Sequence, residues 1–246
     1  MLMVTDEKKQ KRGIYLLPNL FTTAGLFAGF YAIVAAIRGD FESAAIAIFI
    51  AMVMDGLDGR IARMTNTQSA FGAEYDSLAD MVSFGLAPAL VIYQWALLGM
   101  GKIGWMVAFV YAACGALRLA RFNTQIGISD KSYFQGLPSP AAAACIAGWV
   151  WAGTNNSLNE SITTWVALPL TFACGILMVS TLRYHSFKEL DLRGKVPFVV
   201  MLVLVLVFAL IASDPPLILF AGFLIYAISG PILTLTKLKQ HKSDRK

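Results

Sequence analysis

The sequence FESAAIAIFIAMVMDGLDGRIAR, residues 41–63, is apolar as far as Met54 and then carries Asp55 and Asp58. Its length matches the roughly 20 residues that a helix needs to cross a bilayer. An ionisable residue inside a membrane segment costs about 2.5–3.5 kcal/mol on insertion scales, so it is by default a functional candidate. This stretch therefore predicts a membrane helix that carries acidic functional residues near one end.

Seven further runs contain no Asp, Glu, Lys or Arg, and each approaches the length of a membrane span. They cover residues 13–37, 81–101, 103–117, 132–159, 161–182, 196–213 and 215–236. Only 14% of the 246 residues are charged and 57% are hydrophobic, whereas soluble domains are near 25% charged. The composition excludes a typical soluble or disordered chain. We expect an all-α polytopic transmembrane bundle of about eight helices, forming a single domain over residues 1–246.

The Lys and Arg residues predict the orientation of this bundle. Eight spans place both termini on one side, which then receives 18 of the 20 basic residues, and only Arg38 and Lys102 fall on the other side. By the positive-inside rule, the side that is rich in Lys and Arg is expected to be cytoplasmic. The net charge of +5 is explained in this way, so we expect membrane lipids rather than nucleic acid as partners. Three cysteines lie in apolar runs with no CxxC spacing, which favours core packing over a disulfide or zinc site.

Four aspartates lie close together at the end of the second span and the start of the third. Asp55 and Asp58 are three residues apart, and Asp76 and Asp80 are four apart, so each pair shares one face of a helix. Two such faces form an oxygen-rich site suited to hard divalent cations such as Mg²⁺ or Mn²⁺. Nearby glycines and arginines suit phosphate groups; they are Gly56, Gly59, Gly72, Arg60 and Arg63. Together these residues suggest phosphoryl transfer.

Two other interpretations of the aspartates remain open at this point. Some of them could pair with Arg60 and Arg63 as solvated charge beside the membrane. The aspartates could also line the path of a divalent-cation transporter, although the positive charge of Arg63 would serve no purpose in such a path.

Residues 55–80 match the pattern DxxDGxxARx(8)GxxxDxxxD at every fixed position, and the chain therefore resembles the CDP-alcohol phosphatidyltransferases. The resemblance implies transfer of a phosphatidyl group from a CDP-linked lipid to an alcohol with release of CMP, in a homodimer of the prokaryotic cytoplasmic membrane. It implies that Asp55, Asp58, Asp76 and Asp80 bind two divalent metal ions, Mg²⁺ or Mn²⁺. It further implies that Asp80 is the general base near the cytoplasmic face. Contacts to the nucleotide and its diphosphate would come from Gly59, Ala62 and Arg63.

The flanking sequence resembles one branch of this family, the integral-membrane phosphatidylserine synthases. The similar stretches cover residues 17–22, 76–88, 118–123 and 133–141. This resemblance implies CDP-diacylglycerol and L-serine as substrates and CMP as a product. Other acceptor alcohols, namely glycerol phosphate, inositol phosphate or choline, are the alternatives within the same chemistry.

Four residues are candidates for binding the serine acceptor. Arg118 and Arg121 are three residues apart near a predicted helix end, and an arginine can hold a carboxylate through two parallel bonds. Asn123 and Gln135 offer further polar contacts. The alternative is that both arginines anchor the protein at the membrane surface. Asn19 and Thr22 are either an N-cap of the first helix or contacts to the nucleotide.

Overall fold

The computed structural model describes residues 16–124, 133–185 and 198–243, and in this part of the chain it contains eight helical rods. The rods are α1 (Leu16–Ile37), α2 (Phe41–Thr65), a continuous helical segment from Ala70 to Met100, α5 (Lys102–Thr124), α6 (Ser139–Asn155), α7 (Glu160–Val179), α8 (Phe198–Ser213) and α9 (Pro215–Ser243). The prediction of an all-α bundle of eight helices is confirmed. Five of the rods are long and apolar enough to cross a membrane, and α8 is a shorter apolar helix.

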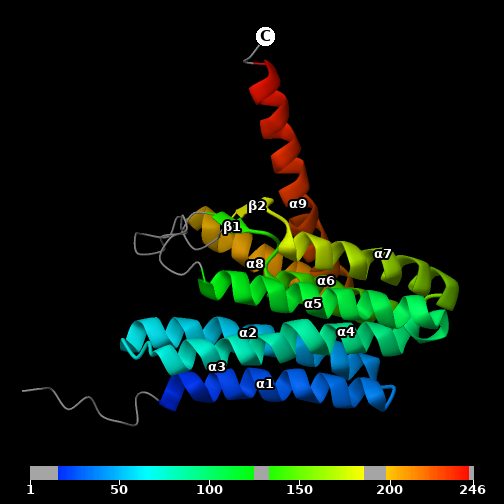
Figure 1. Ribbon diagram of the computed structural model, residues 1–246, viewed down its shortest axis with the longest axis horizontal. Helices are drawn as coiled ribbons and strands as arrows, with labels where there is room; N and C mark the ends of the chain where they lie inside the picture. The colour runs from blue at the N-terminus through cyan, green and yellow to red at the C-terminus, as the bar shows by residue number, and fades with distance from the viewer. Residues whose placement is uncertain (1–15, 125–132, 186–197, 244–246) are drawn as a thin grey trace, which may run out of the picture.

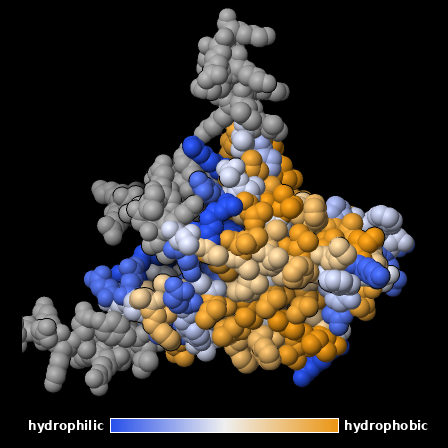
Figure 2. Space-filling view, viewed as in Figure 1, coloured by the Kyte–Doolittle hydropathy of each residue, from blue (hydrophilic) through white to orange (hydrophobic). Residues whose placement is uncertain are grey.

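The helices α1 to α7 lie side by side along one direction, while the last part of α9 runs away from the bundle (Figure 1). Apolar side chains cover the middle of the visible face, and hydrophilic side chains gather toward the two ends of the helices (Figure 2). Such an apolar band between polar ends is typical of a protein that sits in a bilayer. The fold and its surface thus indicate an integral membrane protein.

The third rod is not a uniform α-helix. It consists of α3 (Ala70–Asp80), a π-helical segment η2 (Met81–Leu86), α4 (Ala87–Ile92), a second π-helical segment η3 (Tyr93–Leu97) and a 3₁₀ turn η4 (Leu98–Met100). The charge-free run predicted its start at residue 81, because the aspartates at 76 and 80 interrupt the apolar pattern. The rod in fact begins eleven residues earlier and carries both aspartates on its first part.

The connection between α2 and α3 explains why the two acidic segments face each other. Asn66 ends α2 in the left-handed conformation at φ 51°, and its N–H bonds to the carbonyls of Ala62 and Arg63. Ser69 then caps α3, because its side chain accepts a hydrogen bond of 3.0 Å from the Gly72 N–H. This short connection, residues 67–69, reverses the chain between α2 and α3, and both helices pack against α1.

Small residues allow close packing of the helices, as is common in membranes. Four consecutive alanines of α6, residues 141–144, are buried. A Cβ added at Gly148 of α6 would lie 2.9 Å from the Cα of Phe220, so α9 packs there backbone against backbone. A Cβ at Gly175 of α7 would lie 3.2 Å from the Cα of Tyr111. These contacts join α6 to α9 and α7 to α5.

The structure contains two short strands where the sequence predicted only helices and their connections. β1 (Tyr133–Gln135) and β2 (Arg183–His185) form an antiparallel pair in which Phe134 lies opposite Tyr184. After β1 the chain turns through Gly136, whose φ of 75° favours glycine. Consequently α6 begins at Ser139, seven residues later than the charge-free run beginning at 132 predicted.

Candidate active site

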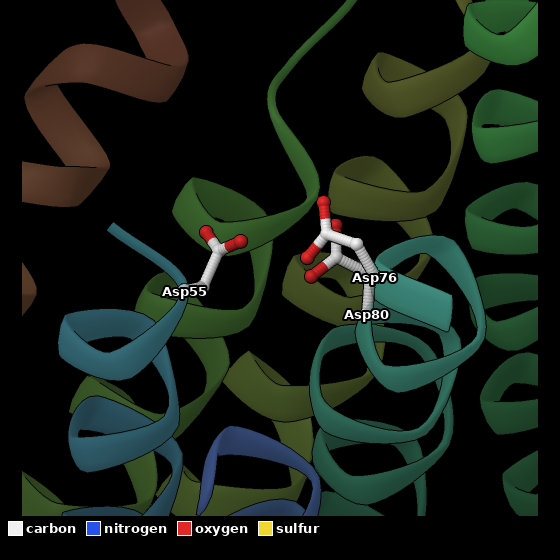
Figure 3. Close-up of side chains that lie close together, drawn as sticks. All are labelled: Asp55, Asp76 and Asp80. Carbon is white, nitrogen blue, oxygen red and sulfur yellow. The ribbon is translucent and has the colours of Figure 1, made fainter. Parts of the chain in front are cut away.

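Three of the four predicted aspartates form one cluster. Asp55 of α2 and Asp76 and Asp80 of α3 each place a carboxylate oxygen so that the three atoms lie within 4.8 Å of one another. All three residues are partly buried. In Figure 3, Asp76 and Asp80 project from the same helix and Asp55 lies across from them on the neighbouring one. The predicted arrangement of two acidic helix faces is therefore present at these positions.

The donor set of this cluster fits a divalent cation. Carboxylate oxygens are the ligands that Mg²⁺ and Mn²⁺ prefer, and the cluster consists of carboxylates alone. Asp80 interacts electrostatically with three other aspartates, at positions 55, 76 and 58, and with a single cation, Arg118. This excess of negative charge in a partly buried place disfavours the folded state unless positive charge is bound. Asp55, Asp76 and Asp80 can therefore hold a metal ion.

Asp58 lies beside the three-residue cluster. Its side chain is only 4% exposed and accepts a hydrogen bond of 2.7 Å from the Thr22 hydroxyl of α1. Asp58 nevertheless lines the same small cavity as Asp55, Asp76 and Asp80. The structure thus brings all four predicted aspartates to one cavity and fixes the orientation of Asp58 through Thr22.

A second, larger cleft lies between α1, α2 and α3 and contains every residue predicted to contact the nucleotide. Its lining includes Asn19, Thr22, Gly59, Ala62 and Arg63. The alternative that Asn19 and Thr22 cap the first helix is wrong, because α1 already begins at Leu16 and both residues lie inside it. The cleft shares Thr22, Asp58 and Asp76 with the small acidic cavity, so the two sites adjoin each other.

Two of the three glycines in the motif line this cleft. A Cβ at Gly72 would lie 3.1 Å from Ser69 Oγ and 3.5 Å from Asn19 Oδ1, and a Cβ at Gly59 would lie 3.5 Å from a guanidinium nitrogen of Arg63. Side chains at these positions would narrow the cleft from both sides. A Cβ at Gly56 meets nothing within 4 Å, and Gly56 is not among the residues that line this cleft.

Arg118 is the predicted acceptor residue that interacts with the acidic site. It donates a hydrogen bond of 2.9 Å to Ser139 Oγ at the start of α6. It also interacts electrostatically with Asp80. Its Nε is buried and has no hydrogen-bond partner. Arg118 therefore keeps an unused donor beside the acidic cluster, which suits an anionic group of a small substrate.

The other three acceptor candidates are less directly placed. Asn123 exchanges hydrogen bonds of 3.1 and 3.2 Å with Ser77, the residue that follows Asp76. Gln135 is exposed on β1, opposite Arg183 of β2. Arg121 lies near the end of α5, where its carbonyl accepts a hydrogen bond from Thr124. Membrane anchoring remains the alternative for Arg121.

The structure adds polar residues that the sequence analysis did not select. Thr67, Gln68 and Ser69, between the two aspartate pairs, line the nucleotide cleft. In the sequence, only their position between the two aspartate pairs indicates that these residues could line the site. Ser139 lies in the stretch 133–141 that resembles the phosphatidylserine synthases, and its bond to Arg118 depends on where α6 lies relative to α5.

Comparisons with known proteins agree with this geometry. The sequence model of the CDP-alcohol phosphatidyltransferase family matches residues 15–177. A CDP-diacylglycerol–serine O-phosphatidyltransferase of Helicobacter pylori (strain J99) is 39% identical over 231 residues, which cover 94% of this chain and 97% of that protein. The enzyme of the same name from Bacillus subtilis is 35% identical over 70% of this chain and 92% of its own length. An archaetidylserine synthase of Methanothermobacter thermautotrophicus is 34% identical over 68% of this chain and 69% of that protein. The four aspartates of the motif line the acidic cavity, and its other fixed residues line the adjoining cleft. Together with this placement, the similarities show that the chain belongs to the CDP-alcohol phosphatidyltransferase family.

Proposed function

We propose that this protein is a CDP-diacylglycerol–serine O-phosphatidyltransferase, which transfers the phosphatidyl group to the hydroxyl of L-serine and releases CMP. The observation that carries the proposal is that the nucleotide cleft adjoins the acidic cavity at Thr22, Asp58 and Asp76. A nucleotide in the cleft would place its diphosphate at the aspartates. The identities of the lipid substrate and of the acceptor are inferred from the names of the relatives.

The nucleotide half of the substrate is held by the cleft. Arg63 faces the cleft beside Gly59, and its guanidinium suits the diphosphate because it can donate two parallel hydrogen bonds. Divalent ions, Mg²⁺ or Mn²⁺, held by Asp55, Asp58, Asp76 and Asp80 would supply neutralisation of the diphosphate charge. We infer two such ions, as the family pattern implies.

The acceptor half of the reaction is assigned to Asp80 and Arg118. Asp80 takes the proton of the serine hydroxyl as its oxygen attacks the phosphorus that carries the lipid. The bond between that phosphorus and the CMP oxygen breaks, so CMP leaves and phosphatidylserine forms. Arg118, with its unpartnered Nε near Asp80, holds the serine carboxylate so that the hydroxyl is oriented toward the reaction.

The proposed membrane placement follows from charge and from the ends of the helices. Arg38 follows α1 and Lys102 begins α5, whereas Arg63 and Arg121 lie in the last turns of α2 and α5, at the opposite end of the bundle. The end that holds the site is therefore the basic one, which we assign to the cytoplasm. The enzyme is proposed to be a single domain in the prokaryotic cytoplasmic membrane, to contact membrane lipids and to act as a homodimer.

One assay tests the function and its alternatives. The purified protein in detergent is incubated with CDP-diacylglycerol, Mn²⁺ and one of serine, glycerol phosphate, inositol phosphate or choline, and CMP release and the lipid product are measured. We expect CMP release with serine only and phosphatidylserine as the product. Release with another alcohol would reassign the acceptor, and cation flux through vesicles without CMP release would replace the enzyme by a transporter.

A further inference from the structure

The helix that carries Asp76 and Asp80 changes its winding directly after Asp80. Residues Met81–Leu86 are π-helical, and the N–H of Ala87 bonds to the carbonyl of Val82, five residues earlier. A π-helical turn is rare and less favourable than an α-helical turn, and it occurs frequently at functional sites. Something in the surroundings must therefore stabilise this segment.

Pro88 accounts for part of the irregular winding. In an α-helix the carbonyl of Phe84 would accept a bond from the N–H four residues later, but that residue is Pro88, which has no N–H. The Tyr111 hydroxyl of α5 donates a hydrogen bond of 2.9 Å to this carbonyl instead. Tyr111 is fully buried and Phe84 is 1% exposed, so water cannot substitute for the phenol.

The π-helical segment also forms a hydrogen bond to α1. Ser83, which is 2% exposed, donates a hydrogen bond of 3.1 Å to the carbonyl of Gly25. A Cβ at Gly29 would lie 2.6 Å from Ser83 Oγ, so glycine is required for this contact. Ser83, Phe84 and Gly25 line the same small cavity as the aspartates.

These contacts determine the direction in which the aspartates point. One residue corresponds to about 100° of rotation in an α-helix, because a turn contains about 3.6 residues. If the π-helical segment relaxed toward α-helical winding, α3 would rotate relative to the rest of the rod. Asp76 and Asp80 would then turn away from Asp55, with which they now form one cluster.

We propose that Tyr111 is a positioning residue of the metal site: its hydroxyl holds the π-helical turn after Asp80 and so directs Asp76 and Asp80 toward Asp55. The proposal rests on the proposed function, since it assumes that the aspartates bind a divalent metal. Tyr111 itself does not touch the cluster in this role and acts through the helix backbone.

The test compares Tyr111→Phe with a matched control, Tyr184→Phe. Tyr184 is also fully buried, and its hydroxyl donates a hydrogen bond of 2.9 Å to a backbone carbonyl, that of Ala227 in α9. Both variants lose the same atoms. The full-length protein in detergent is titrated with Mn²⁺ alone, and the unfolding temperature and the bound Mn²⁺ are measured, the latter by electron paramagnetic resonance.

Tyr111→Phe is expected to raise the Mn²⁺ concentration for half-maximal binding by about tenfold, the scale found when groups that orient metal ligands are removed. Tyr184→Phe is expected to lower the unfolding temperature without moving that midpoint. Equal midpoints for Tyr111→Phe and the wild type would overturn the proposal. If Tyr111→Phe does not fold, Ser83→Ala replaces it and carries the same expectation and the same refutation.

Measurements on the wild type distinguish a failure of the positioning role of Tyr111 from a failure of the metal site or of the proposed function. A wild-type protein that releases CMP and binds Mn²⁺, together with an unchanged Tyr111→Phe midpoint, overturns only the role of Tyr111. A wild-type protein that binds no Mn²⁺ overturns both the metal site and the positioning role. CMP release by such a protein would still support the phosphatidyltransferase activity.

Discussion

Replacing Asp80 with Asn is expected to abolish turnover and, in the absence of metal, to stabilise the fold. Asn keeps the size of the side chain and removes its charge. Two unit charges 4.8 Å apart, the limit for this cluster, repel by about 3 kcal/mol at an effective dielectric constant near 20. Asp80 has two such partners in the cluster, Asp55 and Asp76, and a further repulsion from Asp58, against one attraction from Arg118. The net gain on neutralising Asp80 is therefore at least of the order of one repulsion, about 2–3 kcal/mol after screening.

Two measurements check this expectation. In EDTA, the apparent unfolding temperature of Asp80→Asn should exceed that of the wild type by about 4–12 °C, since 1 kcal/mol shifts a protein of this size by about 2–4 °C. In saturating Mn²⁺ the wild type should gain more stability than the variant, because it keeps all its ligands. CMP release should fall by at least about 100-fold, the lower range for loss of a general base.

Glu74→Gln is the matched control, because Glu74 lies on the same helix α3, is exposed and undergoes the same loss of charge. It should change neither the unfolding temperature in EDTA nor the rate of CMP release. If Asp80→Asn retains more than about 10% of wild-type turnover, Asp80 is not the base. If Asp80→Asn is less stable than the wild type in EDTA, the account of repulsion within the cluster is wrong.

Three further outcomes are expected. EDTA should stop CMP release and Mg²⁺ or Mn²⁺ should restore it, because the cluster is built of carboxylates; full activity in metal-free buffer would contradict the metal site. Gly59→Val should raise the KM for CDP-diacylglycerol and leave that for serine unchanged, because its side chain would displace the Arg63 guanidinium; an unchanged lipid KM would place the nucleotide elsewhere. Arg118→Lys should raise the KM for serine far more than the KM for the CDP-lipid, because lysine lacks the planar fork of the guanidinium. Arg63→Lys should instead raise mainly the KM for the CDP-lipid. If direct binding measurements show that Arg118→Lys weakens serine and CDP-lipid binding equally, Arg118 has a structural role.

The sequence predicted the helices well because the membrane imposes a simple rule on them. A spanning helix must be apolar over its length, so each charge-free run corresponds to one rod of the bundle. The rule fails where function places charge inside a span. The third rod begins at Ala70 rather than at residue 81, since Asp76 and Asp80 lie within it.

The spacing of the aspartates predicted the site for an equally simple reason. Residues three or four apart share a helix face, and a short connection brings the two faces together. Spacing does not reveal that Asp58 bonds to Thr22 or that Arg118 bonds to Ser139. Those contacts join helices that are distant in the sequence, and they depend on how the helices pack.

The parts of the chain contribute unequally to the proposed chemistry. The acidic cavity and the nucleotide cleft are lined by residues of α1, of α2 and of the third rod with the turn before it. The acceptor side adds Arg118 of α5 and Ser139 of α6. All of these lie within residues 15–177, the range that matches the family. Helix α9 lies outside that range but packs its backbone against Gly148 of α6, the helix whose first residue, Ser139, holds Arg118. Tyr226 of α9 also interacts electrostatically with Arg118. We therefore interpret α9 as scaffold that supports the acceptor side, both through α6 and through Tyr226.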